Sequence, residues 1–132
     1  MRALFDTSVV IDPRGADFGG IDAIAISTIT LAELGVGVVQ ASDQMERVKR
    51  TIILQRVRAA FEELVVDAAV ADAYVLAATA MHADGRSPRP RAFDLLIAAT
   101  AIAHDLPLFT RDVKDVLLLR HLIDIRPVPA HA

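Results

Sequence analysis

The sequence predicts an α/β fold: a three-layer arrangement in which a mostly parallel central sheet is flanked by helices. Short apolar runs alternate along the chain with longer stretches of helical periodicity. These short runs are continuously apolar, as expected for strands that are buried on both faces of a parallel sheet. With 132 residues, 54% of them hydrophobic, the chain can bury a substantial core, and we expect one domain spanning residues 1–132.

The first half of the chain is expected to alternate two strands with helical segments. The predicted order is strand 3–5, a helical piece up to 13, loop 14–20, strand 23–26, helix 30–40 and a helical region 42–61. Pro13 stops the first helical piece because proline cannot donate the next backbone hydrogen bond. Ser27 or Thr28 can cap the helix after the second strand. Region 42–61 is amphipathic, which predicts one long helix or a broken pair.

The second half continues the alternation of strands and helices. The predicted order is strand 63–67, helix 68–84, loop 85–91, helix 92–104, strand 106–110 and a last short strand near 123–125. The first of these helices is rich in alanine, the strongest helix former, and ends before Gly85. The loop contains two prolines and three arginines in seven residues, a composition typical of irregular structure.

Global composition excludes several classes of protein. The formal net charge of −3 gives no general affinity for polyanions, so any nucleic-acid contact must use a local basic surface. The absence of cysteine excludes disulfides and thiolate metal sites, and is consistent with a reducing compartment. No uncharged apolar segment reaches the length of a membrane span. We therefore expect a cytoplasmic protein without a membrane segment.

Acidic residues follow the predicted strands or begin the helices beside them. Asp6 ends the first strand, Glu33 lies on the helix after the second, and Asp94 opens the helix after the arginine-rich loop. Asp112 and Asp115 follow the strand 106–110. Ligands of open parallel sheets bind outside the carboxyl ends of the strands, so we expect these carboxylates to meet at one edge.

Carboxylates gathered in this way repel one another unless some are protonated or a cation neutralises them. Oxygen-only ligation suits hard ions such as Mg²⁺ or Mn²⁺. An ion of this kind can activate water and stabilise the charge that builds on a phosphodiester under attack. The pattern therefore predicts hydrolysis of a nucleic-acid backbone.

Each acid also has a purely structural interpretation. Asp6 can be a turn former after a strand, and Asp94 can interact with the helix dipole. Asp112 and Asp115 can form a solvated turn. Glu33 is harder to explain in this way, because apolar and small residues surround it and a buried unpaired carboxylate is costly. The prediction of a site rests on the joint placement of the five.

The arginine-rich loop directly precedes Asp94, so Arg86, Arg89 and Arg91 can guide a nucleic-acid backbone toward the acids. A solvated loop is the equally plausible alternative. Aromatic residues make up only 5% of the chain and there is no tryptophan, which favours recognition of nucleic-acid shape and phosphates over stacked bases. The histidines lack the spacing of metal ligands and are assigned no chemistry: His82, His104, His121 and His131.

Three stretches resemble a known family in order and spacing: LFDTSVVI (4–11), ISTITLAELGVG (26–37) and FDLLIAATAIAHDLPLFTRDVKD (93–115). The sequence resembles PIN-domain proteins, and among them the VapC toxins of bacterial toxin-antitoxin pairs. The resemblance covers essentially the whole chain. It implies a PIN-like fold and an endoribonuclease that depends on Mg²⁺ or Mn²⁺.

The resemblance also implies roles for individual residues. The catalytic acids would be Asp6, Glu33, Asp94 and Asp112, and the metal ligands Asp6, Asp94, Asp112 and Asp115. Family members use either of the last two positions, and here both are aspartate, while Val116 stands where an aromatic residue is usual. Ser8 and Thr110 would be supporting hydroxyls near the metal. The implied partners are an RNA substrate, a second copy of the chain and a VapB-type antitoxin that inserts a basic side chain into the acid pocket.

Two other functions are compared with this one. A non-catalytic PIN-like module that binds RNA or protein is the alternative, but it would be expected to lack one of the acids, and none is missing. Aspartyl-phosphate phosphatases also place an aspartate after the first strand. They need a second aspartate two residues later, where this chain has Ser8.

Overall fold

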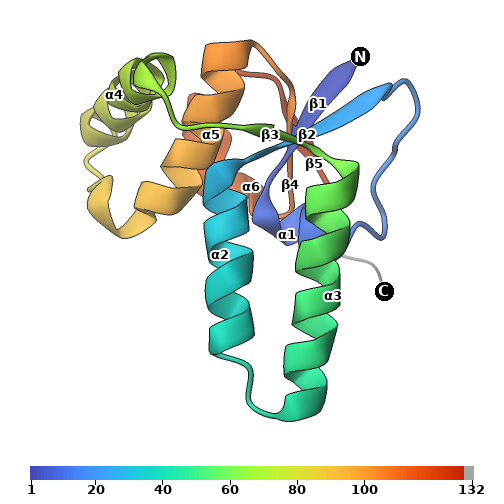
Figure 1. Ribbon diagram of the computed structural model, residues 1–132. Helices are drawn as coiled ribbons and strands as arrows, with labels where there is room; N and C mark the ends of the chain where they lie inside the picture. The colour runs from blue at the N-terminus through green and yellow to red at the C-terminus, as the bar shows by residue number, and fades with distance from the viewer. Residues whose placement is uncertain (130–132) are drawn as a thin grey trace.

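The computed structural model describes residues 1–129 and confirms the predicted α/β fold, with a five-stranded, all-parallel sheet flanked by helices (Figure 1). The strands are β1 (Arg2–Phe5), β2 (Ala23–Ser27), β3 (Glu62–Leu64), β4 (Leu108–Thr110) and β5 (Ile125–Pro127). The helices are α1 (Thr7–Ile11), α2 (Thr28–Val39), α3 (Gln44–Ala60), α4 (Ala68–Ala83), α5 (Ala92–His104) and α6 (Val113–Val116), with 3-10 turns η1 (Arg89–Arg91) and η2 (Leu117–Leu119).

The strand order β3-β2-β1-β4-β5 places β1 at the centre of the sheet. The chain first builds outward on one side through β2 and β3, then crosses to the other side of β1 to form β4. Leu4 pairs with Leu108 and Phe5 with Phe109 at this junction. The strand order therefore reverses between β1 and β4, and such a reversal is where open α/β sheets bind ligands.

Side chains of β1 alternate between two cores, as the period of a strand requires. Leu4 is fully buried in the larger core beneath α4 and α5. Ala3 and Phe5 point to the opposite face, where Val9 of α1 and Val128 cover them. Both faces of the central strand are thus closed, which explains its continuously apolar sequence.

Helices α2 and α3 form a hairpin that extends away from the carboxyl end of the sheet (Figure 1). Ser27 caps α2 by accepting from the N–H of Ile29, and Asp43 caps α3 by accepting from the N–H of Glu46. Region 42–61 is therefore one helix rather than a broken pair. Glu33 lies in the first half of α2, the part of the helix that directly follows β2.

Three local predictions differ from the structure. Strand 63–67 is shorter, because β3 pairs with β2 only as far as Leu64 and the following valines are exposed. The last strand is Ile125–Pro127 rather than 123–125. The strand predicted at 106–110 begins only at Leu108, and the segment after it, for which no element was predicted, forms α6 and η2. Within residues 1–129, no helix combines the length and the apolar character needed to cross a membrane.

Candidate active site

The structure brings all five predicted acids to one cavity of about 110 Å³. The acids lining it are Asp6, Glu33, Asp94, Asp112 and Asp115. They come from four separate segments: the end of β1, helix α2, helix α5, and the segment after β4 that contains the N-cap and the body of α6. The cavity also contains the predicted hydroxyls of Ser8 and Thr110. It therefore lies at the reversal of strand order, as predicted from the ends of the strands.

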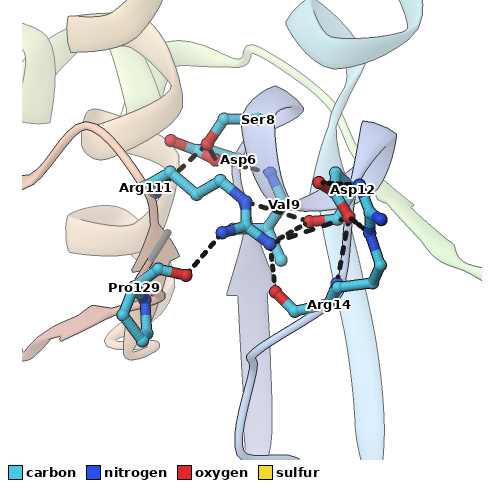
Figure 2. A network of polar contacts seen from close by, with 7 residues as sticks. All are labelled: Asp6, Ser8, Val9, Asp12, Arg14, Arg111 and Pro129. Carbon is cyan, nitrogen blue, oxygen red and sulfur yellow. Dashed lines mark hydrogen bonds and ion pairs between the residues drawn. The ribbon is translucent and has the colours of Figure 1, made fainter. Parts of the chain in front are cut away.

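Asp6 lies directly after β1 and caps α1, so its structural and its functional interpretations are compatible. Its Oδ1 accepts from the hydroxyl of Ser8 at 2.5 Å and from the N–H of Val9 at 3.2 Å (Figure 2). Burial raises the pKa of Asp6, and the nearby charge of Asp112 adds to the increase. The hydroxyls of Ser8 and Thr110 act in the opposite direction by stabilising the ionised form.

Arg111 connects the segments that surround Asp6 (Figure 2). Its backbone N–H donates to Ser8 Oγ at 3.1 Å, so Ser8 bridges Arg111 and Asp6. Its guanidinium donates to the carbonyl of Asp12 from Nε at 3.0 Å and from Nη2 at 2.6 Å. It also donates to the carbonyls of Arg14 and, at 2.7 Å, Pro129. One side chain thus joins the end of α1, the following loop and the C-terminal segment.

Glu33 projects from the first turns of α2 toward Thr7 of α1. The Thr7 hydroxyl donates to Glu33 Oε1 at 2.7 Å, and Thr7 Oγ1 is also hydrogen-bonded to Thr30 Oγ1 at 3.0 Å. Thr30 is fully buried. The Thr7 hydroxyl therefore orients one oxygen of Glu33, Oε1, through this hydrogen bond.

Asp94 lies in the first turn of α5 and is half-buried. Burial is the main cause of its raised pKa, and the charges of Glu33, Asp112, Asp115 and Asp6 each raise it further. The fact that all four other acids act on Asp94 shows that the cluster is electrostatically connected. A cation in the cavity would relieve this repulsion.

Asp112 and Asp115 have different surroundings. Asp112 is exposed, and its N–H donates to Thr110 Oγ1 at 2.9 Å. The side chain of Asp115 is only 16% exposed and forms an ion pair with Arg91 Nη1 at 2.7 Å. Arg91 is therefore directed at an acid of the site through this nitrogen.

The donor set of the cavity fits a hard divalent cation, because it consists of carboxylate and hydroxyl oxygens. Among residues 1–129, no three acids or histidines are already arranged as a group of metal ligands. All five acids nevertheless line one cavity, and the charges of the other four raise the pKa of Asp94, so the acids lie near one another. Mg²⁺ usually keeps several of its waters, so carboxylates near one another can hold it through those waters as well as by direct contact.

Thr7 and Arg111 were not predicted from the sequence. Thr7 adjoins Asp6 in the stretch DTS, and a hydroxyl side chain next to a predicted site acid was the feature of the sequence that could have indicated its role. Arg111 gave no signal, because its partners are backbone carbonyls far away in the sequence. Within the described residues, the lining of the cavity includes no histidine, and His131 lies outside them.

Comparisons with known proteins identify the family to which the chain is similar. Residues 3–114 match the family model of the PIN domain. Ribonuclease VapC4 of Mycobacterium tuberculosis is 37% identical over 116 residues, which cover 84% of this chain and 86% of that protein. Ribonuclease VapC5 of the same organism is 38% identical over 113 residues, which cover 83% and 82%.

A solved structure shows the same similarity over the whole fold. The crystal structure of VapBC-5 from Mycobacterium tuberculosis, a member of the VapBC family of toxin-antitoxin systems, contains a chain that superposes with a TM-score of 0.80. The two chains are 31% identical, and the match covers 98% of each. Fold, length and sequence therefore agree.

Proposed function

This chain belongs to the PIN domain family, and on that premise we propose that it is an endoribonuclease, the toxin of a toxin-antitoxin pair, which hydrolyses RNA phosphodiester bonds. The observation that carries the proposal is the cavity in which five carboxylates meet at the reversal of strand order. The ribonuclease relatives and the toxin-antitoxin structure support the choice of RNA as substrate and of a toxin role.

We propose Mg²⁺ or Mn²⁺ as the cofactor, held by Asp6, Asp94 and Asp112. Asp115 is the fourth ligand of the proposal and becomes available when Arg91 releases it. When bound, such an ion lowers the pKa of a water molecule and offsets negative charge on the phosphate. The raised pKa of Asp94 supports this, because a cavity that disfavours charged carboxylates gains most from a cation.

The residues of the chain have separate tasks in this scheme. Glu33 accepts a proton from the attacking water at Oε2, since Thr7 holds Oε1. Ser8 orients Asp6 through its short hydrogen bond and acts against the rise of the Asp6 pKa, and Thr110 supports both Asp6 and the backbone of Asp112. The arginine-rich turn that carries Arg86 and Arg89 lies before Asp94 and supplies positive charge for the RNA backbone.

The proposed partners follow from the same assignment. A cognate VapB-type antitoxin would silence the toxin, and a basic side chain is the group that an acidic cavity accepts. We also propose that the chain forms a homodimer and acts in the cytoplasm, where cellular RNA is present. Size-exclusion chromatography with light scattering tests the dimer: a mass near twice 14.2 kDa supports it, and a mass near 14.2 kDa contradicts it.

The test of the activity is cleavage of purified cellular RNA by the full chain with Mg²⁺ or Mn²⁺. Cleavage should require the ion and should be abolished by Asp94→Asn. Asp72→Asn is the matched control, because Asp72 is an exposed aspartate on α4 outside the cavity. If the metal-loaded wild type cleaves no RNA, the chain is instead a non-catalytic PIN-like module that binds RNA or protein.

A further inference from the structure

A second cavity, of about 360 Å³, adjoins the acid cavity and shares Glu33 and Asp94 with it. We propose that this second cavity is a subsite for one nucleotide of single-stranded RNA, whose base stacks on Phe93 while Arg89 binds the neighbouring phosphate. The inference deepens the proposed ribonuclease function and rests on it. The volume lies in the range of pockets that hold small organic ligands.

Phe93 differs from the other phenylalanines of the chain. Four of the five meet in one cluster, in which the ring of Phe5 lies 5.6 Å from that of Phe18, 6.5 Å from that of Phe61 and 5.3 Å from that of Phe109. Phe93 is the fifth, and it is 54% exposed. It precedes Asp94 in the first turn of α5 and lines the second cavity. An exposed ring beside an active site is suited to stacking with a base.

The charges around the ring determine where the phosphate can lie. Glu33 and Asp94 repel it on the side that faces the acid cavity. Arg91 also lines the second cavity, but its guanidinium is paired with Asp115. Arg89 is exposed and lines the same cavity. A guanidinium there can bind a phosphate through two parallel hydrogen bonds.

This inference changes the expectation of how RNA is recognised. The low aromatic content favoured recognition by shape and phosphates over stacked bases, but one exposed ring is sufficient for one base. Stacking requires a base that is not already stacked within a helix, so the subsite selects single-stranded RNA. The adjoining acid cavity would then act on the phosphodiester next to the bound nucleotide.

The test is binding of a short oligoadenylate that carries 2-aminopurine, measured with the full chain in an Asp6→Asn background to prevent cleavage. Phe93→Ala should lower the affinity about 5- to 150-fold and abolish the fluorescence quenching that stacking causes, without changing the salt dependence. Arg89→Gln should instead reduce the slope of log affinity against log salt by about 0.7, as expected for one lost phosphate contact.

Two matched controls are available. Leu76→Ala removes a side chain of α4 with the same 54% exposure, and Arg56→Gln removes an exposed arginine of α3. Both should bind like the background protein. Unchanged affinity and quenching in Phe93→Ala would overturn the subsite, as would equal binding of duplex RNA. A change of oligomeric state in place of affinity would also overturn it, and would assign Phe93 to a contact between protein copies.

Failure of the subsite can be distinguished from failure of the proposed function. Cleavage of RNA by the wild type tests the function, whereas the binding experiment tests Phe93 and Arg89. If the wild type and Phe93→Ala cleave single-stranded RNA with the same KM, the ribonuclease stands and the subsite does not. If the wild type cleaves nothing but quenching depends on Phe93, the subsite stands without the activity.

Discussion

Replacing Arg111 by methionine should destabilise the protein substantially, although the residue lies in a turn. The side chain is only 17% exposed and donates to three carbonyls, those of Asp12, Arg14 and Pro129 (Figure 2). Methionine keeps much of the apolar stem but removes every donor. The carbonyl of Asp12 is partly buried, so it cannot fully replace the lost donors with water.

The size of the effect follows from these contacts. A sheltered hydrogen bond to a charged group contributes about 2 kcal/mol, and the bonds to the more exposed carbonyls of Arg14 and Pro129 add about 0.5 kcal/mol each. We expect a loss of about 3 kcal/mol, which for a domain of this size lowers Tm by roughly 10 °C. The activity should fall as well, because Arg111 holds the end of the helix that begins at Asp6.

The assay is thermal unfolding followed by circular dichroism, with Arg14→Met as the matched control. Arg14 pairs with the same Asp12, but its side chain is 69% exposed, and such surface pairs contribute little to stability. The control should stay within about 2 °C of the wild type. If Arg111→Met unfolds at the same temperature as Arg14→Met, the connecting role of Arg111 is refuted.

Three further predictions concern the acid cavity. Asp94→Asn should stabilise the metal-free protein at neutral pH and not in acid. Because the pKa of Asp94 is raised in the folded state, the contribution of protonated Asp94 to stability is complete below about pH 4 and is lost as the pH rises through the folded pKa. Thermal unfolding of both proteins across pH checks this, and equal Tm values at neutral pH contradict it. Thr7→Val should lower kcat about tenfold by removing a hydrogen bond to the Glu33 carboxylate, and an unchanged kcat would exclude this role. Arg91→Gln should tighten Mn²⁺ binding about tenfold, because it removes a nearby positive charge and releases Asp115, and weaker binding in calorimetry would refute this.

The position of the acids could be predicted because one rule governs it. Parallel strands end at the same edge of a sheet, so Asp6 after β1 and Asp112 after β4 had to lie on the same side of the molecule. The sequence did not show that β4 inserts next to β1, which is what makes them neighbours. The strand order depends on packing between distant segments rather than on local pattern.

Other features were beyond local reasoning for related physical reasons. The pairing of Arg91 with Asp115 joins a 3-10 turn to a short helix, and neither element was predicted. Val65 and Val66 continue the apolar run of β3 but are exposed, because the neighbouring strand offers no further partner. The exposure of Phe93 likewise depends on how α5 packs in the folded chain, which the local sequence does not show.

The central claim is that carboxylates from separate segments form one site for a divalent cation. Calorimetric titration of the full chain with Mn²⁺ tests it most directly, using Asp6→Asn and, as control, Asp124→Asn, an exposed acid outside the cavity. We predict binding by the wild type and by the control, and strongly weakened binding by Asp6→Asn. Absence of binding by the wild type, or equal binding by all three proteins, would contradict the claim.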